Sequence, residues 1–308
     1  MSSPTSNPVH VALDELIALA AYAQGAALAR QRCSVALRAG TSSSRWRGRG
    51  VDFRESRIYQ PGDEIRHMDW RVTARTGKPH TKLFEEEREQ ALLLAVDLNP
   101  SMHFGTRERF KSVQAARAAA LIAWMASRAG DRMGALGFGG GISGEVRPAG
   151  GRRGVLRVLR ALRDWDRARD LALTEDLSQA MARARHLLRP GMRLVILSDG
   201  FGATAPGALS ELVARHDIVV VLLRDALELA APPPGRYALH LGEARRIVDF
   251  ADARVRHAWA ERFASSRAGL LDQCRRLAIR VIELDTDADL RGALAPLLAR
   301  ARRSAVVT

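Results

Sequence analysis

The sequence contains little cysteine and few aromatic residues. Its two cysteines, Cys33 and Cys274, lie far apart and form no CxxC pair. This spacing argues against a disulfide framework or a zinc cage and fits a reducing compartment. Aromatic residues make up only 5% of the chain, and they form no cluster with basic residues of the kind that stacks nucleic-acid bases. We therefore expect both cysteines to be buried thiols.

No apolar stretch is long enough to predict a membrane span. Val11–Ala29 is rich in Ala and Leu, but Asp14, Glu15 and Gln24 interrupt it. Such a pattern is typical of an amphipathic helix. The first residues also lack the basic and apolar regions of a secretory signal. A cytoplasmic location is the default expectation.

The charge is strongly one-sided, with a formal net charge of +14. Such a chain can attract acidic proteins, nucleic acid or anionic lipid. The arginines are nevertheless spread over the whole sequence, mostly within predicted helices. The distribution favours solvated helix faces, with an anionic partner as the second interpretation.

Strands and helices alternate from residue 91 onward. The apolar run Leu92–Val96 leads directly into Asp97, which is typical of a strand buried on both faces of a sheet. We expect strands at Leu92–Leu98, Arg132–Phe138, Leu194–Leu197, Ile218–Leu223 and Arg280–Leu284. We expect helices at Arg109–Arg128, Gly154–Arg163, Asp176–Leu188, Pro206–Arg215, Arg254–Leu277 and Leu290–Arg302. This alternation predicts an α/β fold with a doubly wound, mostly parallel sheet.

Three regions are expected along the chain. Residues 1–40 form a polar tail and a helix over residues 10–31, residues 41–90 a small β-rich module, and residues 91–303 the α/β domain, with a hairpin insertion around 236–251. The module opens with the Ser/Gly/Arg-rich linker Thr41–Gly50. Its last strand, His80–Phe84, is expected to pair with the Leu92 strand as a hairpin.

Polar residues follow two of the buried strands. Asp97, Asn99 and Ser101 come directly after the first, Asp199 ends another, and Thr174 precedes a predicted helix. Because parallel strands end at one edge of a sheet, we expect these side chains to converge there. Carboxylate, amide and hydroxyl oxygens suit Mg²⁺ or Mn²⁺. The alternative is that each Asp only caps a turn or helix.

At these residues the chain resembles known families. Asp97-x-Asn99-x-Ser101, Thr174 and Asp199 are similar to the metal-ion-dependent adhesion site of von Willebrand factor A-type domains, with Asn99 in place of a Ser. The YxPGDExRxxDW motif in Tyr59–Trp70 resembles the hallmark of the domain-of-unknown-function-58 family, as does RDALEL at residues 224–229.

The resemblance implies a binding protein and not an enzyme. Its relatives are associated with MoxR-type AAA+ ATPases, in the assembly or activation of protein complexes. A partner's Asp or Glu would complete the coordination of Mg²⁺ held by the five residues, and the basic surface would steer that partner. The residues of the module motif are expected to have structural roles, and the alternative is that they form a docking surface. These residues are Arg57, Tyr59, Asp63, Arg66, Asp69, Trp70 and Arg75. Trp70 is expected to be a buried staple.

Three other functions match parts of the sequence less well. A haloacid-dehalogenase-type phosphohydrolase also begins with an Asp after a buried strand, but Asn99 cannot serve as its general acid. Gly139-x-Gly141-x-x-Gly144 matches a dinucleotide-binding pattern, yet no helix is predicted to follow it, so a hairpin turn is favoured. The third alternative, a nucleic-acid-binding protein, is supported only by the net positive charge.

Two further acidic residues follow the last predicted strand. Asp285 and Asp287 are expected to cap the last helix.

Overall fold

The computed structural model describes residues 7–23, 51–60, 63, 65–86, 90–201, 206–241 and 244–298. The chain divides into two compact units. The larger comprises residues 1–31 and 90–308, and the smaller comprises residues 32–89.

The larger unit is built on a six-stranded sheet with the order β10-β7-β6-β3-β4-β5. Its strands are β3 (Ala91–Asp97), β4 (Arg132–Phe138), β5 (Glu145–Ala149), β6 (Arg193–Ser198), β7 (Asp217–Arg224) and β10 (Arg280–Asp285). All neighbours are parallel except β5, which pairs antiparallel with β4. The predicted α/β fold with a mostly parallel sheet is therefore confirmed.

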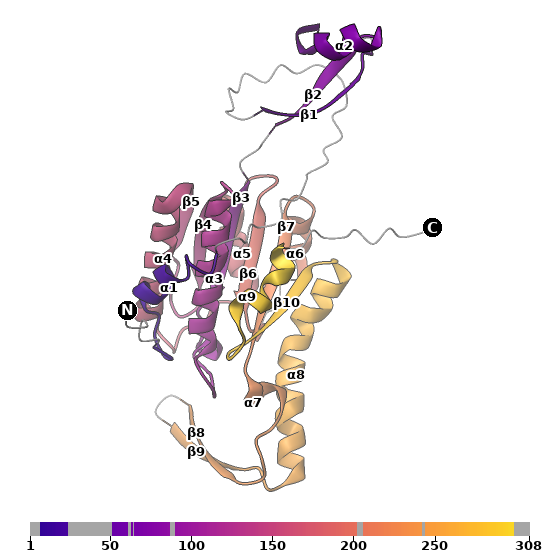
Figure 1. The fold of residues 1–308 in the computed structure, drawn as a ribbon. Helices are drawn as coiled ribbons and strands as arrows, with labels where there is room; N and C mark the ends of the chain where they lie inside the picture. Colours follow the sequence, from indigo (N-terminus) through magenta and orange to yellow (C-terminus); the bar gives the residue numbers. More distant parts are fainter. Residues whose placement is uncertain are drawn as a thin grey trace. The chain divides into compact units, whose positions relative to one another are not determined.

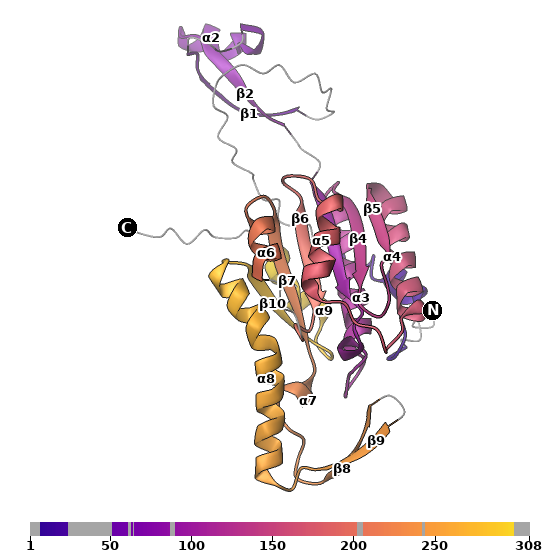
Figure 2. The same cartoon turned by 180° about the vertical axis from the view of Figure 1, so that it is seen from behind.

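Helices cover both faces of this sheet, as Figures 1 and 2 show from opposite sides. Leu92, Leu94 and Val96 pack in one hydrophobic cluster with α1 (Leu13–Ala18), α3 and α4, whereas Leu93 and Ala95 pack in another with α5, α6 and α8. Alternate residues of β3 thus enter opposite cores, which is why Leu92–Val96 is apolar at every position. The helices are α3 (Lys111–Arg128), α4 (Gly151–Ala168), α5 (Leu177–Leu187), α6 (Pro206–Val213), α7 (Ala226–Leu229) and α8 (Ala253–Arg276).

Helices at the two ends of the chain are shorter than the sequence predicts. The N-terminal helix α1 spans Leu13–Ala18, and residues 24–31 of the predicted helix lie outside the described part. The last helix is interrupted, with α9 at Leu290–Ala293 and α10 at Ala295–Leu298. Pro296 has no N–H to donate to the carbonyl of residue 292, so a continuous helix cannot form there.

The smaller unit contains β1 (Val51–Ile58), a 3₁₀ turn η1 (Ile65–His67), α2 (Trp70–Thr76) and β2 (His80–Glu86). β2 pairs antiparallel with β1, so the expected hairpin with the Leu92 strand is wrong. The Tyr59 amide donates to the Pro79 carbonyl (2.9 Å), which joins the end of β1 to the beginning of β2. The Asp69 amide donates to the His80 carbonyl (2.8 Å), which joins the start of α2 to β2. Cys33 and the linker 41–50 lie outside the described residues.

A second hairpin, β8 (Arg236–Leu241) with β9 (Ala244–Asp249), lies between α7 and α8, as the alternating pattern predicts. In Figures 1 and 2 it extends beyond the end of the sheet, beside α7 and the beginning of α8. Among the described residues, no helix has the length and apolar character needed to cross a membrane.

Candidate functional site

Asp97 and Asp199 lie at the carboxyl ends of β3 and β6, which are neighbours in the sheet. Asp97 is only 2% exposed and Asp199 is fully buried. One Asp97 oxygen accepts hydrogen bonds from the backbone and the side-chain nitrogen of Asn99 (2.9 and 2.8 Å). The other accepts from the Ser198 hydroxyl (2.6 Å). The sheet thus places two carboxylates together, as the sequence predicts.

Burial raises the pKa of Asp97 to about 7, and the charge of Asp199 adds to this rise, while hydrogen bonds from Ser198 and Asn99 act in the opposite direction. No Lys or Arg side chain among the described residues forms an ion pair with Asp97. The ionised carboxylate therefore has no cationic partner within the described part of the chain, and a cation beside it would be favourable.

Asn99 connects the loop after β3 to the segment that carries Thr174. Its side-chain nitrogen donates to the Glu175 carbonyl (3.0 Å), and its oxygen accepts from the Glu175 amide (2.9 Å). Thr174 is exposed and Ser101 is half-buried, and neither hydroxyl has a hydrogen-bond partner among the described residues. Asn99 thus brings Thr174 to the edge where the carboxylates lie.

The glycine-rich sequence after β4 is a turn that packs against this loop. Gly139, Gly140 and Gly141 all have positive φ angles (79°, 57° and 69°), and the antiparallel strand β5 follows. A Cβ on Gly139 would lie 2.5 Å from Cγ of Asn99. The preference for a hairpin turn over a dinucleotide-binding loop is confirmed.

Gly139→Ala is expected to destabilise the larger unit by about 2 kcal/mol or more, because a strained backbone is combined with a clash against Asn99. Gly191→Ala is the matched control, since its φ is also positive (86°) but, apart from its two chain neighbours, no atom of the described residues lies within 4 Å of the added Cβ. Urea denaturation of both variants measures the difference. Equal losses of stability would show that the contact with Asn99 is unimportant.

Lys111 is a buried cation that the sequence interpretation missed. It is fully buried at the first position of α3. Its ammonium contacts carboxylate oxygens of Asp199 (2.7 Å) and Glu228 (2.5 Å) and lies 4.5 Å from the centre of the Phe201 ring. Burial raises the pKa of Glu228, although the charge of Lys111 opposes this rise. A lysine at a helix start carries no sequence signal that distinguishes it from a surface residue.

Asp225, in the RDALEL segment, holds the surrounding loops together. It accepts hydrogen bonds from the backbone and hydroxyl of Thr106 (2.9 and 2.6 Å), from the Thr286 hydroxyl (2.9 Å) and from the Leu227 amide (3.0 Å). Burial opposes ionisation of Asp225, but these bonds hold its pKa below the ordinary value. The motif is therefore a structural connection between three segments at this edge.

The residues at this edge fit a divalent cation in ligand type, and of the two carboxylates Asp199 already pairs with Lys111. Asp97 has no counter-ion, and the hydroxyls of Ser101 and Thr174 are unengaged within the described structure. No group of three or more His, Cys, Asp or Glu side chains is placed to hold a metal among the residues described. A metal here would therefore depend on hydroxyl and amide oxygens in addition to two carboxylates, which suits Mg²⁺.

The motif of the smaller unit is largely a set of internal contacts. Arg57 pairs with Asp63 (2.6 Å). Asp69 caps α2 by accepting from the Val72 amide (3.2 Å), and it also accepts from the Ser56 hydroxyl (2.7 Å). Among the other motif residues, Tyr59 is half-buried, and those that are exposed are Arg66, Trp70 and Arg75. Trp70, the first residue of α2, is 65% exposed, so it is not part of a buried core within the smaller unit.

Trp70→Ala is accordingly expected to change the free energy of unfolding by no more than about 0.5 kcal/mol, as for other surface positions. Asp69→Ala removes the helix cap and should cost about 1 kcal/mol. Chemical denaturation followed by circular dichroism compares the two. A loss of several kcal/mol in Trp70→Ala would contradict the exposed position.

The expected caps at Asp285 and Asp287 are also wrong. Asp285 forms an ion pair with Arg224 (2.8 Å), and Asp287 forms one with Arg107 (2.5 Å). The cap of α9 is Asp289, which accepts from the amide of residue 292 (2.8 Å). Arg224 and Arg107, which pair with Asp285 and Asp287, are distant from them in the sequence. The local sequence pattern therefore favours a helix cap over these ion pairs.

Comparisons with known proteins place the chain in a family. The family model described as a protein of unknown function, DUF58, matches residues 55–269. The uncharacterised protein Rv1480 of Mycobacterium tuberculosis is 32% identical over 261 residues, which cover 84% of this chain and 82% of that protein. The uncharacterised protein Mb1516 of Mycobacterium bovis matches to the same extent.

Among solved structures, the conserved hypothetical protein BatB from Bacteroides thetaiotaomicron aligns with a TM-score of 0.40 and 13% identity, over 68% of this chain and 96% of that one. An aerotolerance-related membrane protein from Bacteroides fragilis aligns with a TM-score of 0.39 and 15% identity, over 68% and 96% of the two chains. The family match and the mycobacterial relatives are the stronger findings, and on them this chain belongs to the DUF58 family of proteins of unknown function.

Proposed function

We propose that this protein is a non-enzymatic, magnesium-dependent protein-interaction module whose larger unit is a von Willebrand factor A-like domain. The observation that carries the proposal is the pair of buried carboxylates, Asp97 and Asp199, at the ends of adjacent parallel strands. Asp97 has no cationic partner among the described residues, and the edge carries oxygen ligands in addition to the carboxylates.

Mg²⁺ would be held by Asp97, Ser101 and Asp199, with Thr174 and the amide oxygen of Asn99 in reach of the same edge. When bound, the metal would supply an electrophilic position for one carboxylate oxygen of a partner's Asp or Glu. The chain's own residues shape this position. Asn99 connects its two loops through Glu175, and Ser198 orients Asp97.

The chemistry of the neighbouring side chains supports binding rather than catalysis. The Asn99 amide is bonded to Asp97 and Glu175, and an amide cannot give and take the proton that a phosphohydrolase of the haloacid-dehalogenase type requires. His103 contacts Arg169 and the ring of Phe110. Burial and the charge of Arg169 lower the pKa of His103 to about 4, so it is a poor general base at neutral pH.

The partner best supported is a MoxR-type AAA+ ATPase, and this proposal rests on the resemblance of the Tyr59–Trp70 motif. The net charge of +14 would favour an acidic surface on that partner and raise the rate of association. The client protein complex would then be assembled or activated through this pair.

Affinity capture of a MoxR-type AAA+ ATPase by the tagged full chain tests the proposal. We expect capture with Mg²⁺, and loss of capture in EDTA or with Asp97→Ala. Asp164→Ala is the control, because Asp164 is an exposed carboxylate paired only with the adjacent Arg163 among the described residues. Capture that is unaffected by both EDTA and Asp97→Ala would contradict a metal-bridged interaction.

A further inference from the structure

An arm extends from the candidate metal edge. It consists of α7, the hairpin β8–β9 and the helix α8, which follow one another in the chain. In Figures 1 and 2 the hairpin and the beginning of α8 extend past the end of the sheet at which α7 lies. α7 carries Glu228, one of the two carboxylates that contact Lys111.

A continuous series of aromatic rings connects this arm to the edge. Phe201, two residues after Asp199, contacts Phe263 of α8, with ring centres 5.5 Å apart. Phe263 contacts Trp259 (5.0 Å), and Trp259 contacts Phe250 (5.0 Å) at the end of the hairpin. Phe250 contacts Tyr237 of β8 (5.6 Å). The rings therefore pack from the loop after β6 to the base of the hairpin.

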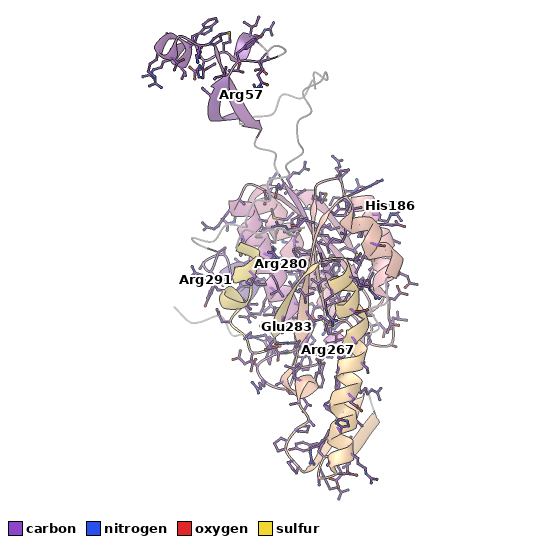
Figure 3. The ribbon with its side chains drawn as sticks, turned by 90° about the vertical axis from the view of Figure 1, so that its right-hand side faces the viewer. Arg57, His186, Arg267, Arg280, Glu283 and Arg291 are labelled. Atoms are coloured by element: carbon purple, nitrogen blue, oxygen red, sulfur yellow. The ribbon has the colours of Figure 1, made fainter. Side chains whose placement is uncertain are left out.

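Polar contacts follow the same route. The indole nitrogen of Trp259 donates to the Leu227 carbonyl (2.7 Å). Arg267 of α8, labelled in Figure 3, donates to the Glu228 carbonyl (3.2 Å) and lies 3.7 Å from its carboxylate. The ammonium of Lys111 then joins Glu228 to Asp199.

We infer that Lys111 is a positioning residue that couples the candidate metal site to the arm, so that metal binding and the conformation of the arm affect one another. This inference rests on the proposed function. Lys111 is fully buried, so water cannot replace either carboxylate around its ammonium. A cation bound beside Asp199 would neutralise part of the carboxylate charge that now attracts Lys111. The Lys111 ammonium would then interact more strongly with the Glu228 carboxylate.

A change at Glu228 reaches α8 directly, because Trp259 and Arg267 both bond to α7. By thermodynamic linkage, a partner that binds the arm changes the affinity of the site for the metal by the same factor as the metal changes the affinity of the arm for that partner. A partner that binds the arm would therefore tune the strength of the metal site.

Two matched tryptophan variants of the full chain test the inference. Trp259→Phe removes the hydrogen bond to the Leu227 carbonyl and keeps a ring in place. Trp124→Phe removes an equivalent bond to the Leu16 carbonyl (3.0 Å), which joins α3 to α1. Neither substitution changes a charge. We expect Trp259→Phe to weaken Mg²⁺ binding at least threefold by calorimetry, and Trp124→Phe to leave it unchanged.

¹⁹F NMR of protein labelled with 5-fluorotryptophan tests the same coupling without a partner. The Trp259 signal, assigned by its loss in Trp259→Phe, is expected to shift during a Mg²⁺ titration, while the Trp124 signal stays fixed. Glu228→Gln should abolish the shift, because Lys111 then has only one carboxylate to contact. Mg²⁺ binding by the wild type without a Trp259 shift, and with equal affinity in Trp259→Phe, would overturn the coupling alone. Absence of Mg²⁺ binding by the wild type would overturn the proposed function and the coupling with it.

Discussion

Replacing Lys111 by methionine is expected to destabilise the larger unit by about 3–5 kcal/mol, which is the usual cost of removing one partner from a buried ion pair. Lys111 is enclosed between Asp199 and Glu228, and all three side chains are buried. Methionine fills a similar volume but leaves two carboxylates without their shared cation. Urea denaturation followed by far-UV circular dichroism measures the loss in free energy of unfolding.

Two comparisons make this prediction specific to the buried cluster. Arg185→Met removes an exposed partner of Glu211 and should change stability by less than about 0.5 kcal/mol. Adding Glu228→Gln to Lys111→Met should restore part of the loss, because one of the two buried carboxylate charges that Lys111 contacted is removed. If Lys111→Met costs no more than Arg185→Met, the buried ion pairs do not contribute as described.

Asp97→Asn is expected to raise the melting temperature at pH 8 while abolishing Mg²⁺ binding. The pKa of Asp97 is raised from 3.8 to about 7 in the folded protein, so the folded state favours the protonated carboxyl. The associated stability is fully present below about pH 4 and is lost as the pH rises through 7. A shift of this size corresponds to about 4 kcal/mol as an upper value. Asparagine stays neutral and keeps an oxygen for the Asn99 donors.

Melting curves in EDTA from pH 4 to pH 8 test this prediction. The advantage of Asp97→Asn should be largest at pH 8 and shrink toward pH 4. Mg²⁺ should reverse the order at pH 8, because it binds the ionised carboxylate of the wild type only. Parallel pH profiles for the two proteins would show that Asp97 is not held in an environment that opposes its ionisation.

The sheet and its helices could be predicted from sequence because their signals are local. Leu92–Val96 is apolar at every position because alternate residues enter the two cores. The turn after β4 could also be predicted from its glycines, because its three consecutive residues have positive φ angles. Glycine adopts such angles without steric cost. The partner of β2 could not be predicted, because a strand's pattern does not state which of two flanking strands it pairs with.

The candidate site was only partly visible in the sequence. Asp97 and Asp199 follow apolar runs, and parallel strands bring their ends together. The roles of Lys111 and Glu228 depend on contacts between residues 88 and 117 positions apart, and no local sequence pattern predicts such contacts. The exposure of Trp70 within the smaller unit has no local signal either, since a Trp in a dense motif is equally compatible with a buried position and with an exposed first helical turn.

Calorimetric titration of the purified full chain with Mg²⁺ at pH 8 tests the central claim most directly, with Asp97→Asn and the surface control Asp164→Ala measured beside the wild type. The account predicts that the wild type and Asp164→Ala bind Mg²⁺ with the same affinity, and that Asp97→Asn does not bind it. Absence of binding by the wild type, or equal binding by all three proteins, would contradict a metal site at the carboxyl ends of β3 and β6.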